Sequence, residues 1–144
     1  MWLLAVTGTP IFSGCYPDYR PPAREAPQAF LDVRTVPGPK LCVDGKYYFL
    51  PSQERGGWVR VPAEQRVGVL SEIYSAPGPY WGGFSCSPRL SFATRSGEAY
   101  QVRFRLVPGK CVLDVHQVRD GAVGPPEPTI GPLFTGDDPL TCAF

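Results

Sequence analysis

The stretch Glu98–Val107, EAYQVRFRLV, decides the fold class of this chain. Its apolar residues stand two positions apart, and polar or charged residues occupy the positions between them. Side chains two positions apart share one face of a β-strand, but they do not share one face of a helix. The stretch therefore predicts a half-buried strand whose inner face carries Tyr100, Val102, Phe104 and Leu106.

The segments on both sides of this strand have the same character. Arg89–Thr94 alternates around Leu90 and Phe92, and a short turn that contains Gly97 follows it. Lys110–Val118 begins directly after a Pro-Gly turn. Glycine and proline are typical of turns between neighbouring strands. We therefore expect three successive antiparallel strands, a meander, with the first two forming a hairpin.

The first half of the chain adds further short strands. The pair Asp44-Gly45 lies between two apolar runs, which is a strong hairpin signal. Other candidates are 30–36, 58–61 and 66–74. No helix longer than two turns is indicated. These patterns predict an all-β fold, an antiparallel β-sandwich of about seven or eight short strands over residues 30–119.

The composition excludes some classes of function. The chain has 144 residues, a length that fits one domain, and 14 basic and 13 acidic residues give it a net charge of +1. No block of clustered Lys and Arg is present, so we expect no nucleic-acid partner. The 16 glycines and 18 prolines predict many turns.

The first fourteen residues read as a targeting segment. Residues 1–14 carry no charge and are mostly apolar or small. They are too few to span a membrane as a helix, but they suit the apolar region of a signal peptide. The alternative is a buried first strand followed by a free cysteine.

The end of this segment resembles the lipobox of bacterial lipoproteins. The residues are Phe12-Ser13-Gly14-Cys15, with Phe12 where leucine is usual and with no Lys or Arg before the apolar run. The resemblance implies cleavage before Cys15 and attachment of a lipid anchor to its sulfur, with palmitate among the acyl chains. Tyr16 stands where aspartate would favour the inner membrane. The expected location is therefore the outer membrane, facing the periplasm, with surface exposure as an alternative.

The residues after the lipobox predict a tether. Residues 15–29 contain four prolines and mixed charges. Proline fixes φ and lacks a backbone donor, so this segment cannot be a helix interior or a central strand. We expect a semi-rigid spacer that holds the domain clear of the lipid headgroups.

The cysteine count supports export. Five cysteines are an awkward number in an oxidising compartment, but lipidation of Cys15 leaves four. Their spacing does not suit a zinc site. Four cysteines allow three pairings. We expect Cys86–Cys111 at one end of the meander and, by elimination, Cys42–Cys142, which would pin the Gly/Pro-rich tail of residues 120–144 along the domain.

A second resemblance concerns the order of turns and strands. The runs "VDGK", "VRVPAEQR" and "CSPRLSFATRSGEAYQVRF" resemble small envelope lipoproteins with PEGA-like or transthyretin-like sandwich modules. The similarity covers about residues 30–118, and "VPAE" lacks the glycine usual in the second turn. Members of these groups are mostly uncharacterised, or they act as binding and scaffolding modules. The resemblance implies the fold more than the function.

One loop is a candidate binding site. Tyr80, Trp81 and Phe84 stand among glycines and prolines in Ser75–Phe84, SAPGPYWGGF. Aromatic side chains on such a loop can bind a protein or a glycan, because they supply contact area at a low entropy cost. The alternative is that the loop folds back and plugs one end of the sandwich.

Catalysis has little support in the sequence. His116 is the sole histidine and shares a strand face with Asp114, a pair that could orient an imidazole. No GxSxG motif is present, and Asp137-Asp138 reads as a turn. We therefore expect no catalytic residue, no metal and no cofactor. The predicted function is binding or scaffolding in the envelope. The alternatives are a subunit of a secretion apparatus and a periplasmic enzyme that uses His116.

Overall fold

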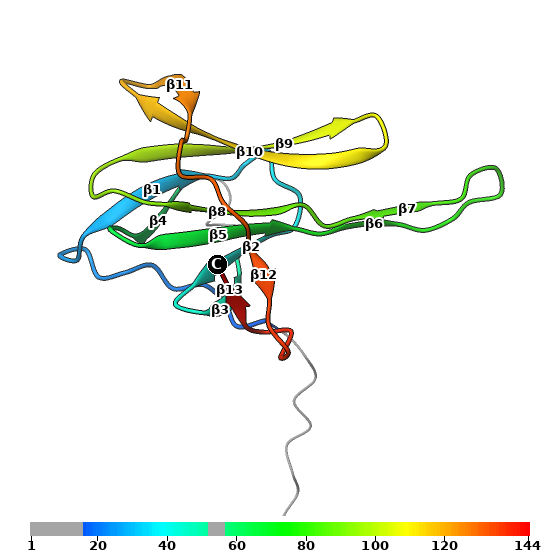
Figure 1. Ribbon diagram of the computed structural model, residues 1–144, viewed down its shortest axis with the longest axis horizontal. Coiled ribbons are helices and arrows are strands. Elements are labelled where there is room, and N and C mark those ends of the chain that lie inside the picture. Colours follow the sequence, from blue (N-terminus) through cyan, green and yellow to red (C-terminus); the bar gives the residue numbers. More distant parts are fainter. Residues whose placement is uncertain (1–15, 52–56) are drawn as a thin grey trace, which may run out of the picture.

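The computed structural model describes residues 16–51 and 57–144. These residues form thirteen strands and contain no α-helix. Figure 1 shows two stacked layers of strands, with one narrow ribbon projecting from an end. The all-β class predicted from the sequence is confirmed, although the strands are more numerous than expected. The predicted signal segment and Cys15 lie outside the described residues.

One layer is a five-stranded sheet. Its order is β11-β10-β9-β1-β4, and β1 and β9 run parallel to each other while the other neighbours are antiparallel. The strand that decided the fold class is therefore its central strand. The bounds are β1 Gln28–Asp32, β4 Trp58–Pro62, β9 Ala99–Val107, β10 Lys110–Arg119 and β11 Ala122–Pro126.

The second layer is a four-stranded antiparallel sheet of order β3-β2-β5-β8. The hairpin predicted at Asp44-Gly45 joins β2 to β3 and is confirmed. Both turn residues have positive φ, 50° and 78°, as a two-residue type I′ turn requires. The bounds are β2 Pro39–Val43, β3 Lys46–Phe49, β5 Arg66–Ser71 and β8 Arg89–Ala93.

The core lies between the two layers. Phe92 of β8 and Tyr100 of β9 face each other across it, with ring centroids 5.1 Å apart. Both sheets contribute side chains that are shielded from solvent. The five-stranded sheet gives Leu31, Val59, Val61, Tyr100, Val102 and Val115, and the four-stranded sheet gives Leu41, Val67, Val69 and Phe92.

The predicted meander is wrong at its first turn. β8 pairs with β5 in one sheet, and β9 pairs with β10 and β1 in the other. The turn around Gly97 therefore crosses between the layers instead of closing a hairpin. The alternation of apolar and polar residues predicts that Phe92 and Tyr100 both point into the core. Two strands in opposite layers fit this pattern as well as two paired strands of one sheet do.

The C-terminal segment is part of the fold. A second Asp-Gly turn, Asp120-Gly121, has φ values of 51° and 75° and begins β11. Further along, Gly131 exchanges backbone hydrogen bonds of 2.8 and 2.9 Å with Ser91 on the edge strand β8. Leu133 is buried at 3% exposure. The chain ends in the short pair β12 (Phe134–Thr135) and β13 (Cys142–Ala143).

The segment expected to be a spacer lies against the domain instead. The amide of Phe49 donates to the Pro17 carbonyl and the amide of Tyr19 donates to the Phe49 carbonyl, both at 2.8 Å. Tyr19 is only 5% exposed, and its hydroxyl donates to the carbonyl of Arg60 at 2.7 Å. The proline-rich composition ruled out a central strand, but it did not rule out a segment that covers an edge.

Candidate functional site

The ribbon in Figure 1 is the far end of a long hairpin. β5 and β8 are paired inside the four-stranded sheet, and the same two chain segments continue as β6 (Ile73–Ser75) and β7 (Phe84–Cys86). This continuation, residues 73–86, extends past the sandwich, and we call it the aromatic arm. It contains the loop that the sequence singled out.

The tip of the aromatic arm is an ordered turn. Gly78 and Trp81 exchange backbone hydrogen bonds of 3.0 and 3.4 Å. The indole of Trp81 lies against Gly78, where a Cβ atom would overlap it. Gly83 has a φ of 72°, and a Cβ there would lie 2.6 Å from the carbonyl oxygen of Ser75. The two glycines therefore permit a compact hairpin that other residues would distort.

The aromatic side chains of the arm face solvent. Tyr80 is 99% exposed, Tyr74 is 75% exposed, and Trp81 and Phe84 are 48% and 45% exposed. The loop therefore does not plug the sandwich, and this alternative is wrong. Exposed aromatic residues grouped on one projection are typical of surfaces that contact another molecule.

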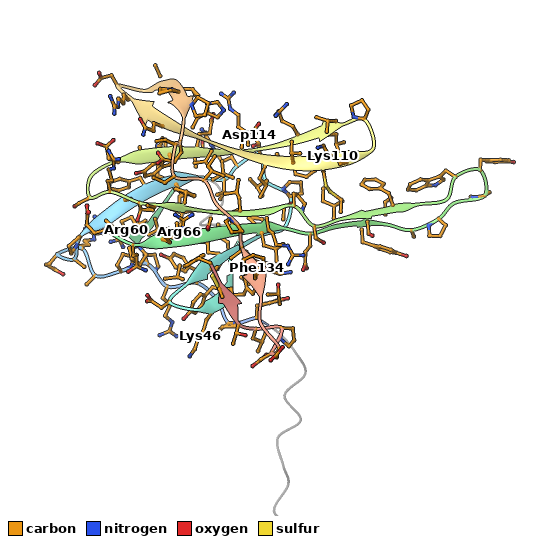
Figure 2. All side chains as sticks on the ribbon, in the orientation of Figure 1. Lys46, Arg60, Arg66, Lys110, Asp114 and Phe134 are labelled. Carbon is orange, nitrogen blue, oxygen red and sulfur yellow. A yellow bond between two sulfur atoms is a disulfide. The ribbon has the colours of Figure 1, made fainter. Side chains whose placement is uncertain are left out.

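A groove separates the arm from the end of the β9–β10 hairpin. Its volume is about 380 Å³. Phe84 and Cys86 line one side of the groove. Leu106, Lys110 and Cys111 line the other side. Figure 2 shows Lys110 near the end of its hairpin, above the arm.

The predicted disulfide Cys86–Cys111 is present and fixes the two sides of this groove. It joins β7 to β10, with the two Cα atoms 6.4 Å apart. The pairing was predicted correctly, but for a wrong reason. The bond connects the two layers, whereas the prediction placed both cysteines in one meander. Its effect is to tie the base of the aromatic arm to the opposite sheet.

The other predicted disulfide has a structural role. Cys42 of β2 and Cys142 of β13 are bonded, and they are 0% and 7% exposed. They pack with Tyr47, Leu70 and Leu133 in a second buried cluster. This bond holds the C-terminal segment on the outer side of the four-stranded sheet.

The Asp114–His116 pair that the sequence offered for catalysis does not form. Asp114 pairs with Arg105 of the adjacent strand. The Nδ1 atom of His116 lies 3.2 Å from the carbonyl oxygen of Gly124. The carboxylate and the imidazole thus have separate partners. Figure 2 labels Asp114 on the five-stranded sheet, away from the aromatic arm.

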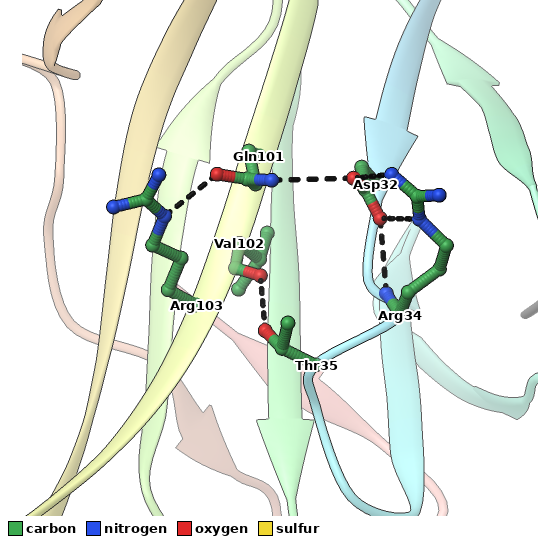
Figure 3. A network of polar contacts seen from close by, with 6 residues as sticks. All are labelled: Asp32, Arg34, Thr35, Gln101, Val102 and Arg103. Atoms are coloured by element: carbon green, nitrogen blue, oxygen red, sulfur yellow. Dashed lines mark hydrogen bonds and ion pairs between the residues drawn. The ribbon is translucent and has the colours of Figure 1, made fainter. Parts of the chain in front are cut away.

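A polar network crosses the five-stranded sheet near its centre (Figure 3). Asp32, 4% exposed, accepts hydrogen bonds from the Arg34 side chain at 2.9 and 2.8 Å and from Gln101 at 3.3 Å. Arg103 donates to the side-chain carbonyl of Gln101 at 2.6 Å. The Arg34 hydrogen bonds hold the pKa of Asp32 below its ordinary value, against the opposing effect of burial. The hydrogen bonds of Gln101 and Arg103 therefore give the polar face of β9 a structural role.

The sequence did not identify Leu106 and Lys110 of the groove, or Tyr74 of the aromatic arm, as candidate site residues. Tyr74, Leu106 and Lys110 were assigned to strands without a functional role. Leu106 could have been found, since it continues the inner-face alternation of β9 beyond the point where the core can cover it. Tyr74 and Lys110 carry no such signal, because only the three-dimensional pairing brings their strands to one end of the molecule.

Comparison with protein-family models, curated proteins and solved structures finds no match for this chain. In residues 16–51 and 57–144, no group of three or more His, Cys, Asp or Glu side chains is placed to hold a metal ion. The same residues form no helix long and apolar enough to cross a membrane.

Proposed function

We propose that this protein is a lipid-anchored module of the bacterial envelope that binds another protein through the aromatic arm. The observation that carries the proposal is the exposure of Tyr80, Trp81 and Phe84 on an arm whose turn is built around Gly78 and Gly83. A preformed aromatic surface loses little conformational entropy when it binds. Binding, rather than catalysis, is the function that this geometry supports best.

The arm is tested by comparing Trp81→Ala with Trp58→Ala. Both indoles are 48% exposed, but Trp58 lies on β4 of the other sheet. Both side chains are about half covered, so each change should lower the free energy of unfolding by a similar amount, about 1–2 kcal/mol, and leave the protein folded. Trp81→Ala should remove crosslinks to a partner in intact envelopes, and Trp58→Ala should keep them. Unchanged crosslinks in Trp81→Ala would contradict the proposal.

The anchor rests on the lipobox-like sequence that ends at Cys15. Two disulfides in the folded part support an oxidising compartment, which agrees with export. Cys15→Ser should release the protein from membranes or block its maturation. Metabolic labelling with a palmitate analogue is the direct measurement, and an unlabelled wild-type protein would refute the anchor. The proposed location is the outer membrane, with the domain in the periplasm.

In this proposal the lipid anchor holds the sandwich directly at the membrane surface, and the expected long spacer is absent. Tyr16, the residue after Cys15, packs edge-on against Tyr47 with ring centroids 6.3 Å apart. The Lys40 ammonium lies 4.3 Å from the centre of the Tyr16 ring, a cation–π contact. A lipid on Cys15 would therefore hold the sandwich close to the headgroups, and the aromatic arm would keep one orientation relative to the anchor.

A further inference from the structure

The apolar inner faces of both layers continue beyond the core at one end of the sandwich. Along β9, the exposed fraction rises from 1% at Tyr100 and 0% at Val102 to 67% at Leu106. Along the other layer, it rises from 0% at Phe92 to 45% at Phe84. Tyr100, Val102 and Leu106 share one face of β9, because even numbers of residues separate them. Phe84 lies on β7, and the Cys86–Cys111 bond shows which way its face points. The sandwich thus has an open apolar end.

Leu106 and Phe84 face each other across this open end. Leu106 is the direct cross-strand partner of Cys111 in the β9–β10 hairpin, so the two side chains share a face. Phe84 and Cys86 are two residues apart on β7 and also share a face. The Cys86–Cys111 bond shows that these two faces point toward each other. The groove of about 380 Å³ lies between them.

The open end carries positive charge only. Residues 73–86 of the aromatic arm contain no charged side chain. The residues that line the groove include Lys110 and no carboxylate. A bound segment with an acidic group would therefore meet a complementary charge at the rim, whereas a basic segment would be repelled.

We propose, building on the function above, that the open end binds an extended polypeptide segment of a partner protein. One or two apolar side chains of the segment enter between Phe84 and Leu106, and an acidic side chain lies beside Lys110. The groove is recessed between two layers, which suits single side chains better than a bilayer surface. Its lining offers few polar groups to a sugar. A symmetric dimer through this surface would bring two Lys110 ammonium groups into one interface.

Two amidated peptides serve as probes, Leu-Thr-Val-Thr-Phe-Glu and its counterpart that ends in Lys. The protein carries ¹³C-labelled methyl groups, so that weak binding appears as shifts of the Leu106 and Val107 signals. We expect the acidic peptide to bind about fivefold more tightly than the basic one. Lys110→Gln should remove this difference. Equal binding of the two peptides to the wild type, or no binding, would overturn the proposal.

Substitutions locate the binding surface. Leu106→Ser should weaken binding of the acidic peptide about tenfold and leave the melting temperature nearly unchanged, because Leu106 is 67% exposed. The matched control is Val123→Ser, since Val123 is 42% exposed on β11 and lines no part of this groove. It should bind as the wild type does. Equal weakening in both variants would overturn the assignment of the groove.

Other occupants give different results. Sedimentation with vesicles of phosphatidylcholine and phosphatidylglycerol that requires Leu106, without peptide binding, would make this a lipid surface and overturn the proposal. Self-association that Leu106→Ser abolishes would overturn it in favour of a second copy. If neither peptide binds but Trp81→Ala still loses its envelope crosslinks, the groove inference fails while the proposed function stands.

Discussion

Single residues with positive φ shape the turns of this protein. Asp44, Glu64 and Asp120 adopt φ values between 50° and 59°, a region that non-glycine residues rarely occupy. Glu64 adopts this conformation in the turn between β4 and β5. Its carboxylate accepts a hydrogen bond of 2.8 Å from the amide of Ser96, which offsets part of the conformational cost.

Gly83 offers a sharp test of the aromatic arm. In Gly83→Ala, the new Cβ would meet the backbone of Ser75 and Pro77 in a conformation with φ of 72°, which costs about 1–2 kcal/mol. Gly82→Ala is the matched control, because no atom lies within 4 Å of its added Cβ. We expect faster amide exchange at Gly78 and Trp81 in Gly83→Ala alone, measured by NMR. Equal exchange in both variants would contradict the described turn.

Asp32 should give the protein a specific dependence on pH. Its pKa in the folded state is lowered, so its ionised form adds stability above the ordinary aspartate pKa. That contribution disappears as the pH falls through the folded-state pKa, below about 4. The difference in free energy of unfolding between wild type and Asp32→Asn should therefore be largest at neutral pH and shrink toward pH 2. Denaturation at a series of pH values measures it, and a constant difference would refute the assignment.

At the scale of elements, alternation located most strands but not their sheets. The hairpin at Asp44-Gly45 was predictable because the turn needs two positive φ values that these residues tolerate. The same dipeptide at Asp120-Gly121 carries the same signal and begins β11, which the sequence reasoning left inside a tail without strands. Gly97 supplies a turn in either arrangement, so the sequence could not decide between a hairpin and a crossing of the core.

The candidate site was predictable in part. Tyr80, Trp81 and Phe84 were identified from their glycine-rich surroundings, and both disulfide pairs were expected. Whether the loop would be buried or exposed could not be decided, because this depends on where β5 and β8 leave the sheet. Leu106 faces Phe84 because segments distant in the sequence lie side by side, and local sequence patterns carry no information about such contacts.

The two disulfides should differ in their effect on stability. Cys42–Cys142 spans a sequence separation of 100, and Cys86–Cys111 spans 25. Loop-closure entropy predicts losses of about 4.7 and about 3.5 kcal/mol respectively when each pair is replaced by alanines. Urea denaturation of the two double variants measures this order. A larger loss for Cys86→Ala/Cys111→Ala would show that the aromatic arm contributes to the core, against its exposure.

Across the whole molecule, the terminal segments complete the sandwich by covering its edges. Residues 17–19 pair with Phe49 on β3, and Gly131 pairs with Ser91 on β8. Open edge strands invite pairing with other chains, so this cover protects the sandwich from aggregation. The short strands of the aromatic arm receive no such cover from these segments, which agrees with the proposed binding surface.

The domain boundary at residue 30 that the sequence suggested can be tested by truncation. A chain that begins at Tyr16 keeps the buried Tyr19 and its hydrogen bonds, whereas a chain that begins at Phe30 loses them together with Gln28 and Ala29 of β1. Loss of a buried aromatic side chain costs about 3–5 kcal/mol, so the shorter chain should be less stable by at least about 3 kcal/mol. It should also aggregate more readily, because Phe49 at the end of β3 loses its pairing with residues 17–19.

Point variants separate the contribution of Tyr19 from that of chain length. In the chain that begins at Tyr16, Tyr19→Ala should account for about 3 kcal/mol of the loss, because the buried ring packs edge-on against Tyr48 with centroids 6.0 Å apart. The missing start of β1 accounts for the remainder. Arg24→Ala, an exposed residue of the same segment, should cost about 0.5 kcal/mol or less. Urea denaturation compares the four proteins. Equal stability of the two chain lengths would mean that residues 16–29 are a spacer after all, and the proposed lipid anchor on Cys15 would then hold the sandwich at a distance from the membrane.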